Sequence, residues 1–185
     1  MNKVTAKKFL KKYSPVLGIL FAVAISVLVF VFRNKFVSLQ NYGYLGLFVL
    51  SILGNATIIL PFPTILSAFL GGAVFNPLIT GVVISLGAAI GELTGYLAGA
   101  GGGEIIEKDL RVQKVRKWMD KYGLWTLFIL AVIPNPLFDL AGIVAGATKI
   151  PVYKYLIVVW LGKLVKFVAI SYLGAGSVNL IDRFV

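Results

Sequence analysis

The sequence predicts an all-α polytopic membrane protein. An N-terminal transmembrane helix is followed by two copies, in inverted topology, of a re-entrant helical hairpin plus a transmembrane helix. Hydrophobic residues make up 59% of the 185 residues and charged residues only 14%, whereas soluble domains are about half apolar and a quarter charged. The only charged residue between Phe36 and Gly103 is Glu92. Within the apolar sequence, short segments broken by proline alternate with longer unbroken ones.

The first expected element is a transmembrane helix within residues 1–35, which also form a basic N-terminus. Residues 1–12 contain five lysines and no acid, and residues 16–32 form an uncharged apolar run of 17 residues. That length is the lower limit for a helix crossing roughly 30 Å of hydrocarbon. The alternative is a signal peptide, but the run exceeds the usual apolar region of about 7–15 residues and no small-residue cleavage site follows it. We therefore expect a retained span.

The first repeat is expected within residues 36–103. Residues 42–75 are predicted to form a re-entrant hairpin, because each proline in its tip removes a backbone donor and disfavours helix at the preceding residue. Residues 64–75 are too few to cross the hydrocarbon at about 1.5 Å per residue. Residues 78–100 are long enough to span. The tip of this hairpin consists of Pro61, Phe62 and Pro63.

Residues 104–121 form the polar segment between the repeats. They contain six Lys/Arg and four acidic residues, with apolar residues between them. This composition predicts a cytoplasmic amphipathic helix lying on the surface beside a bilayer. Nucleic-acid binding is the weaker interpretation, because the segment is short and carries both signs of charge.

The second repeat, residues 122–185, is predicted to contain a re-entrant hairpin at 122–148 and a span at 152–175. The segments YGYLGLFVL at 42–50 and YGLWTLFIL at 122–130 agree at Tyr, Gly, Leu, Phe and the final Leu. Proline-containing breaks then follow in the same order in both halves, although chance similarity between apolar segments is the alternative. The tip of the second hairpin consists of Pro134, Asn135 and Pro136.

One span per repeat makes the number of crossings odd, so the second repeat must be inverted relative to the first. With a cytoplasmic N-terminus and the C-terminus outside, 13 Lys/Arg lie inside and three outside. This is a strong positive-inside bias, and it predicts a protein of the plasma or inner membrane. It also accounts for most of the net charge of +11 without nucleic acid. Facing broken hairpins near the midplane of inverted repeats are typical of transporter-like substrate sites.

Four ionisable residues are predicted to lie in the membrane interior as a substrate or ion path: Glu92, Asp139, Lys163 and Lys166. A carboxylate at this depth costs about 2.5–3.5 kcal/mol on insertion scales, so it should face protein or water and find a partner. Aligning Pro77 with Pro151 places Glu92 at the position of Lys166. In the functional interpretation, an acid carries a proton or faces a cationic head group, and the lysines meet a phosphate. The alternative is a pair of structural salt bridges between the spans.

Two further sets of residues are expected to have structural roles. Asn55, Asn76 and Asn135 are expected to cap freed backbone groups near the breaks rather than act as ligands. A stripe of glycines at every fourth position predicts a helix-packing seam, with dimerisation as the alternative. These glycines are Gly87, Gly91, Gly95, Gly99 and Gly103, and Gly142 and Gly146 form a shorter version.

The sequence argues against an enzyme. Without cysteine or histidine there is no Ser-His-Asp triad, no common zinc site and no thiol redox chemistry. An intramembrane aspartyl site needs two aspartates, and Asp139 is the only one in the apolar region. The glycines at 101–103 lack the Gly-Lys-Ser/Thr of a P-loop. We expect no catalytic residue, no metal and no cofactor.

The motifs in residues 36–176 together resemble the VTT-domain superfamily, also called the DedA or SNARE-associated Golgi protein superfamily. The resemblance lies in Pro61-Phe62-Pro63, Gly71-Gly72, Gly91-Glu92-x-x-Gly95-Tyr96, and Ile133-Pro134-Asn135-Pro136 followed by Ala141-Gly142 and Ala145-Gly146. It implies an integral membrane protein with two opposed re-entrant hairpins. It also implies lipid movement across bilayers, as phospholipid scrambling or as polyprenyl-phosphate recycling with proton dependence.

The sequence departs from the DedA branch at its charged motif positions. Asn55 and Thr64 stand near the first tip where that branch has acidic residues, and Ala131 and Leu137 stand where it has arginines. The expected function is therefore a more general lipid translocator. Its expected partners are anionic or phosphate-bearing membrane lipids, with protons as a further candidate. The alternatives are a proton-coupled secondary transporter of a small solute and a non-transporting membrane organiser. The oligomeric state is left open.

Overall fold

The structure is a computed structural model that describes residues 42–56, 64–106, 110–135 and 137–181. Every element in this part of the chain is an α-helix, which confirms the predicted all-α class. The predicted N-terminal transmembrane helix, the first tip at residues 61–63 and Pro136 lie outside the described residues. The helices are α3 (Gly43–Asn55), α4 (Thr64–Val74), α5 (Pro77–Gly91), α6 (Leu93–Ile106), α7 (Leu110–Tyr122), α8 (Leu124–Val132), α9 (Leu137–Ala147) and α10 (Val152–Ile181).

Local side-chain chemistry sets several of the helix ends. Asn76 caps α5 by accepting a hydrogen bond of 3.1 Å from the backbone of Ile79, and proline occupies the first helical turn. Asn135 accepts a hydrogen bond of 3.0 Å from the backbone N–H of Leu137 where α9 begins. After α9, Lys149 adopts a left-handed conformation with φ 56°. Asn76 and Asn135 thus have the capping geometry expected of them.

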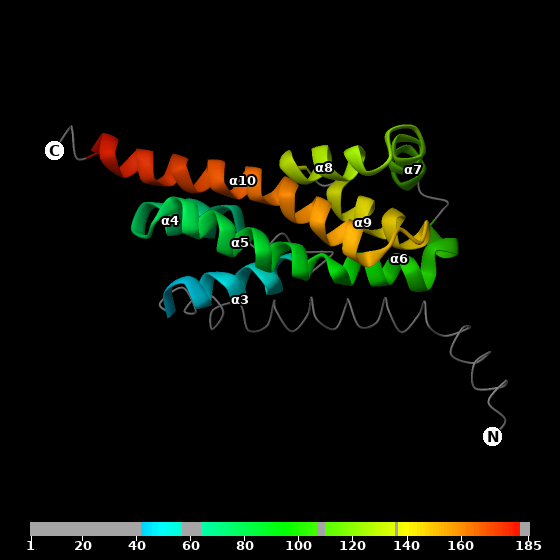
Figure 1. The fold of residues 1–185 in the computed structure, drawn as a ribbon, viewed down its shortest axis with the longest axis horizontal. Coiled ribbons are helices and arrows are strands. Elements are labelled where there is room, and N and C mark those ends of the chain that lie inside the picture. Colours follow the sequence, from blue (N-terminus) through cyan, green and yellow to red (C-terminus); the bar gives the residue numbers. More distant parts are fainter. Residues whose placement is uncertain (1–41, 57–63, 107–109, 136, 182–185) are drawn as a thin grey trace, which may run out of the picture.

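Two long helices form the centre of the fold. By length and composition, Pro77–Gly101 and Val152–Ser177 are both apolar enough to cross a membrane. The first comprises α5 and most of α6, interrupted at Glu92, and the second is most of α10. Figure 1 shows them running alongside each other in opposite directions. This supports a membrane protein with two spans among the described residues.

Helices α3 and α4 form a hairpin against one half of this pair. Helix α3 packs on α5, and α4 packs on α10. The two ends of the hairpin are in contact: the backbone N–H of Asn76, after α4, donates to the hydroxyl of Tyr44, near the start of α3, over 3.1 Å. The rings of Tyr44 and Phe75 also lie 5.2 Å apart. Helices of 13 and 11 residues are only about 20 and 17 Å long.

Helices α8 and α9 form a second hairpin against the other half. Helix α8 packs on α10, and α9 packs on α6. Gly123, which precedes α8, and Thr148, which follows α9, line one pocket, so the two ends of this hairpin also meet. The two hairpins therefore cover opposite halves of the central pair of helices (Figure 1).

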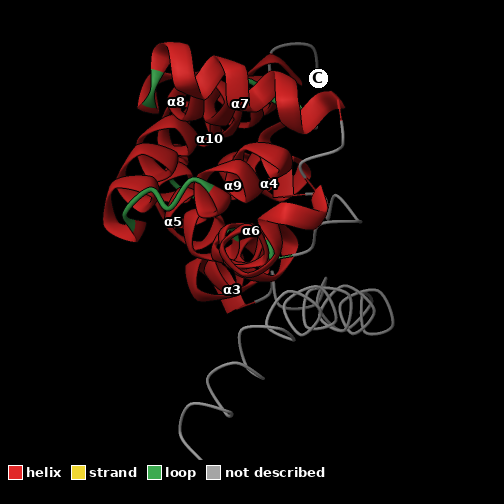
Figure 2. Ribbon diagram, turned by 90° about the vertical axis from the view of Figure 1, so that its right-hand side faces the viewer, coloured by secondary structure: helices red, strands yellow, loops and turns green. Residues whose placement is uncertain are grey.

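Helix α7 lies across the end of the molecule where α6 ends and α10 begins. Figure 1 shows α7 end-on, whereas Figure 2 shows α6 end-on and α7 from the side. Val112, Val115 and Met119 are buried, and α7 packs on α8 and α9. The apolar face of α7 therefore contacts protein. The location of this helix beside a bilayer stays a prediction. The helix also starts later than expected, at Leu110, while α6 continues to Ile106.

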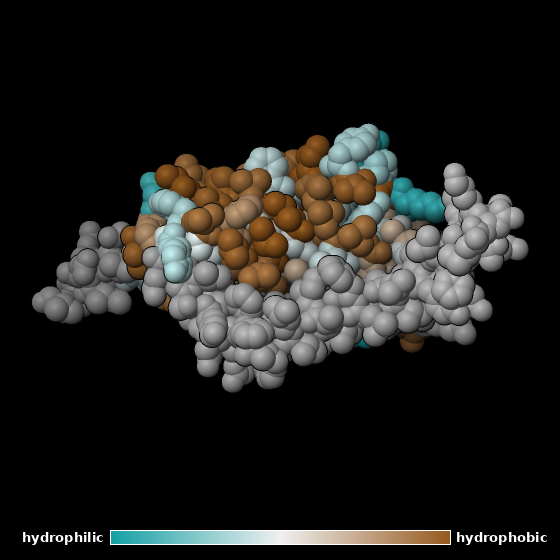
Figure 3. Space-filling model, turned by 90° about the horizontal axis from the view of Figure 1, so that it is seen from below, coloured by the Kyte–Doolittle hydropathy of each residue, from teal (hydrophilic) through white to brown (hydrophobic). Residues whose placement is uncertain are grey.

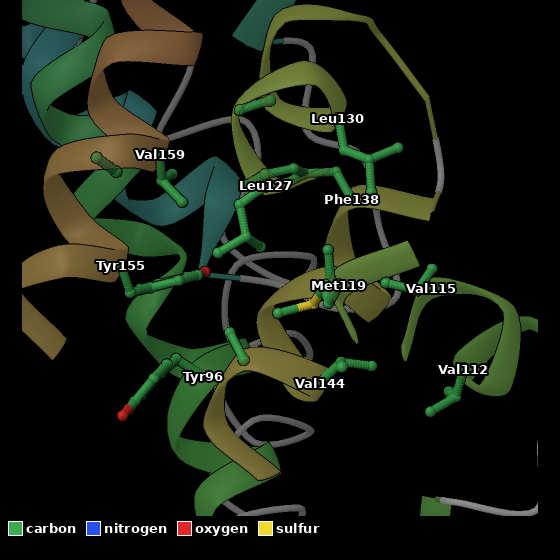
Figure 4. Packing of buried hydrophobic residues seen from close by; sticks show 14 residues of the cluster. Tyr96, Val112, Val115, Met119, Leu127, Leu130, Phe138, Val144, Tyr155 and Val159 are labelled. Atoms are coloured by element: carbon green, nitrogen blue, oxygen red, sulfur yellow. The ribbon is translucent and has the colours of Figure 1, made fainter. Parts of the chain in front are cut away.

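Each hairpin contributes to a separate hydrophobic core, and α10 contributes to both. The smaller core joins α3, α4 and α5 to Phe167 of α10. The larger core contains residues of α6, α7, α8 and α9 together with Tyr155 and Val159 of α10 (Figure 4). Outside these cores, many large hydrophobic side chains are exposed, and they gather over the middle of the face shown in Figure 3. Such a surface suits a hydrocarbon environment.

Glycines allow the helix backbones to approach closely. A Cβ atom on Gly72 would collide with the backbone of Ser171, and one on Gly174 would collide with that of Phe69. Helices α4 and α10 are therefore in direct contact. Helices α6 and α9 approach each other in the same way. A Cβ atom on Gly99 would collide with Ile143, and one on Gly146 would collide with Tyr96. Small residues at such positions are typical of helix packing in membranes.

We predict that Gly174→Ala lowers the midpoint of thermal unfolding, because the new methyl group would meet the carbonyl oxygen of Phe69. Gly176→Ala is the matched control in the same helix, since no atom lies within 4 Å of its Cβ position. That change should be neutral or stabilise by up to about 1 kcal/mol through helix propensity. Unfolding in detergent micelles measures both. Equal effects of the two variants would contradict the close packing.

Candidate functional site

The candidate site is a buried ion pair between the two long helices. The Nζ atom of Lys163 lies 2.8 Å from the Oε1 atom of Glu92. Their side chains are 2% and 6% exposed, respectively. Glu92 occupies the interruption between α5 and α6, and Lys163 lies in the middle part of α10. The pair therefore joins the two candidate spans near their centres.

Both hairpins also contact the ammonium group of Lys163. Its Nζ atom donates to the Oδ1 atom of Asn55, at the end of α3, over 2.7 Å. It also lies 4.8 Å from the ring centroid of Phe138 in α9, which is within cation–π range. The amide nitrogen of Asn55 donates to the Ser51 carbonyl over 2.8 Å and to the Thr64 hydroxyl over 3.3 Å. These two bonds fix the amide with its oxygen toward the lysine.

Two tyrosines support the backbone beside the pair. The hydroxyl of Tyr155, a fully buried residue of α10, donates to the carbonyl of Glu92 over 3.3 Å. Its ring centroid lies 5.0 Å from that of Tyr96, and Figure 4 shows both residues in the larger core. The hydroxyl of Tyr96 donates in turn to the carbonyl of Ile150. The interruption at Glu92 is thereby tied to α10 and to the turn before it.

The structure brings the four predicted path residues close enough to interact electrostatically, but only two of them are in direct contact. It brings Glu92 and Lys163 together, whereas Lys166 forms no ion pair with Glu92. Three residues advance about 300° around a helix, so the two lysines differ by about 60° in direction. The Nζ atom of Lys166 lies 5.1 Å from the ring centroid of Phe167. The pairing inferred from aligning Pro77 with Pro151 is therefore replaced by the pairing with Lys163.

Asp139 and the second tip lie near the pair without joining it. Asp139 is partly exposed on α9, one residue after Phe138, and it forms no ion pair with either lysine. Pro134 is exposed, and Asn135 also donates to the carbonyls of Leu130 and Ile133 over 3.0 and 2.7 Å. In this structure Asn135 holds the tip backbone rather than facing the ion pair.

The glycine stripe changes its neighbour along the first span. Cβ atoms on Gly87 and Gly91 would meet α3, whereas one on Gly99 would meet α9. Gly95 lies between them, and its nearest neighbour is the carbonyl oxygen of Asp139 at 3.7 Å. Gly103 lies in α6. One helix face thus packs first on one hairpin and then on the other.

Sequence reasoning missed three residues of the site. The sequence indicates only backbone capping for Asn55, and nothing in it singles out Phe138 or Tyr155. Asn55 does bind the Ser51 carbonyl, but its oxygen faces Lys163. The available signal was position, because Asn55 and Phe138 both lie close to a hairpin tip. In the described residues no group of three acidic, histidine or cysteine side chains could hold a metal.

The arrangement can hold two opposite charges in contact with each other and out of contact with water. Burying two charges costs several kcal/mol per ion, and their attraction offsets this cost only with good geometry and additional hydrogen bonds. The 2.8 Å contact and the Asn55 bond supply both. The fold and site thus define a helical membrane protein with a charged centre.

Comparison with known proteins identifies the family. The VTT domain model matches residues 60–176, so this chain belongs to the VTT domain family. The chain is 31% identical over 106 residues to vacuole membrane protein KMS2 of Arabidopsis thaliana, covering 47% of this chain and 26% of the plant protein. It therefore spans about a quarter of that relative. No solved structure matches the chain.

Two microbial relatives are covered more fully. The uncharacterized membrane protein YbfM of Bacillus subtilis (strain 168) is 31% identical over 109 residues, which are 52% of this chain and 67% of that protein. The uncharacterized protein MJ0201 of Methanocaldococcus jannaschii is 29% identical over 136 residues, which are 69% of this chain and 81% of that protein. Together with the two apolar helices, these matches support a membrane protein.

We predict that Glu92→Gln and Lys163→Met are each strongly destabilising, by about 3–5 kcal/mol, because each leaves one buried charge without its partner. The double variant should be more stable than either single variant, since it removes both charges. Thermal unfolding of the four proteins in detergent measures the coupling. Additive losses of stability would show that the two side chains do not depend on each other.

Proposed function

We propose that this protein is an integral membrane lipid translocator that moves a phospholipid or lipid phosphate between leaflets. The head group passes the Glu92–Lys163 pair while the lipid tails stay in the bilayer. The observation that carries this proposal is the buried ion pair, whose lysine lies on one long helix, pairs with the other and contacts both hairpins. The proposed process breaks no covalent bond, so the proposal assigns no catalytic residue and no cofactor.

An inverted repeat is the architecture we propose for this activity, and matched glycine contacts support it. Gly87 faces Phe48, Ser51 and Ile52, and Gly162 faces Phe128, Ala131 and Val132. Each hairpin residue in the second set lies 80 positions after its counterpart, and the glycines lie 75 apart.

The same correspondence holds in the other halves of the long helices. The contact of Gly72, in the first hairpin, with Ser171 corresponds to that of Gly146, in the second hairpin, with Tyr96. Likewise, the contact of Gly174 with Phe69 corresponds to that of Gly99 with Ile143. Corresponding hairpin residues are 74 positions apart and corresponding span residues 75. Repeats of this kind place substrate sites at their interface near the midplane.

Re-entrant entry of the hairpins from opposite membrane sides is also part of the proposal. Neither hairpin has a helix long enough to cross roughly 30 Å of hydrocarbon. The basic residues of α7, together with Lys149 and Lys154, favour a cytoplasmic location for the end that α7 covers. We accordingly propose that the C-terminal end of α10 lies outside and the N-terminus inside, in the plasma or inner membrane.

The pair has the chemistry required for a lipid head group. A phosphate can replace Glu92 as the partner of Lys163, and a cationic group can take the place of the lysine beside Glu92. Asn55 and Phe138 keep the ammonium in place during such an exchange. A head group thus avoids part of the cost of leaving water, which is the main barrier to lipid movement.

Proteoliposomes with a fluorescent phospholipid test the proposal. We expect the wild-type protein to accelerate transfer between leaflets, measured by quenching of the outer leaflet. The Glu92→Gln/Lys163→Met double variant should lose at least about tenfold in rate, because the fixed charges are gone although neither is left unpaired.

Gly176→Ala serves as the control and should keep the wild-type rate, since its Cβ position is open. A folded double variant with unchanged transfer would contradict a role for the pair. An absence of protein-dependent transfer in the wild type would contradict lipid translocation, and solute uptake by the same vesicles would favour a secondary transporter.

A further inference from the structure

An open pocket lies away from the buried ion pair, at the end of the molecule that α7 covers. It forms between the turn from α7 to α8 and the turn from α9 to α10, and its volume is about 350 Å³. That size is at the lower end of the range of ligand sites and suits a head group rather than a whole lipid. Its lining includes Asp120, Gly123, Leu124, Ile150, Pro151 and Lys154.

The pocket carries two opposite charges that do not neutralise each other. Asp120 at the end of α7 and Lys154 in the first turn of α10 are both exposed. Both residues are described, and they form no ion pair with each other. Opposite charges held apart in one pocket match a ligand that itself carries both signs, because each ligand charge then meets its complement.

The remaining lining suits a small organic zwitterion. Leu124, Ile150 and Pro151 supply apolar surface for methylene groups. Gly123 lines the pocket and starts α8 without a side-chain cap, so backbone N–H groups at that end favour an anionic group in the pocket. A ligand with an anion and a cation joined by a short carbon chain fits this pattern.

The position of the pocket points to a membrane lipid. Helix α7 lies across the ends of the long helices, which is the level expected of head groups (Figures 1 and 2). Trp125 and Tyr153, next to lining residues, are 69% and 62% exposed. Exposed tryptophan and tyrosine are typical of membrane–water interfaces. A lysine and an aspartate at this level meet the head groups of the adjacent leaflet.

We infer that this pocket binds the head group of a zwitterionic phospholipid. Lys154 receives the phosphate, and Asp120 receives the ammonium. The inference does not depend on lipid translocation, since binding at the pocket is measured without transport. A protein that fails the transfer experiment can still bind here, and the reverse also holds.

The test is thermal unfolding of the full chain in an uncharged maltoside detergent, titrated with short-chain lipids. Dihexanoyl phosphatidylethanolamine carries both charges, whereas dihexanoyl phosphatidylglycerol carries the phosphate alone. The wild type should show an unfolding midpoint that rises more with phosphatidylethanolamine. Lys154→Gln should weaken the apparent affinity for both lipids by about tenfold, the loss of one charge-assisted hydrogen bond.

Asp120→Asn separates this inference from general charge effects. In this variant, phosphatidylethanolamine should raise the unfolding midpoint no more than phosphatidylglycerol does. The rise with phosphatidylglycerol should be the same as in the wild type or larger. Lys117→Gln, which removes an exposed α7 charge outside the pocket, should behave as wild type.

Three results would overturn the inference. Equal responses of the wild type to the two lipids would exclude recognition of the ammonium. Pocket variants that match Lys117→Gln would exclude this pocket. Soluble glycerophosphoethanolamine that binds as tightly as the lipid would identify the ligand as a free solute.

Discussion

The proposed re-entrant arrangement depends on a mismatch between the length of the hairpin helices and the thickness of a membrane. Helices α3, α4, α8 and α9 contain 9–13 residues, or about 14–20 Å of helix, against roughly 30 Å of hydrocarbon. In the proposed arrangement each pair enters and leaves on one side, so its broken tip lies inside the membrane. Backbone groups exposed there need protein around them, and close glycine packing against the long helices provides it. The same geometry brings Asn55 and Phe138 to the centre, where they meet Lys163.

The buried ion pair is an expensive way to join two helices. Well-packed apolar side chains of similar volume commonly hold such positions at equal or lower free energy. Here the lysine is instead held by a carboxylate, an amide oxygen and an aromatic ring from three different parts of the fold. Such complete coordination keeps one charge arrangement at the centre. In the proposed transport, a charged head group competes with this arrangement for one member of the pair.

Much of the fold could be predicted because its signals are local. Asn76-Pro77 and Ile133-Pro134 break helices through backbone chemistry, and long uncharged runs mark the two long helices. The sequence also marked Glu92 and the lysines as unusual at membrane depth. Which lysine pairs with Glu92 depends on helix rotation and on packing between distant segments, so the alignment favoured Lys166 and the structure has Lys163. The contacts of Asn55 and the protein-facing side of α7 depend on tertiary packing in the same way.

Thiol labelling tests the central claim, the opposed re-entrant hairpins, most directly. The chain has no cysteine, so single cysteines at the exposed positions Tyr42, Val74, Tyr122 and Lys149 report without background. A membrane-impermeant maleimide is applied to oriented vesicles from one side at a time. The account predicts that cysteines at 42 and 74 react from one side and those at 122 and 149 from the opposite side. Reaction of the two ends of either hairpin from different sides would contradict it, because that hairpin would then cross the membrane.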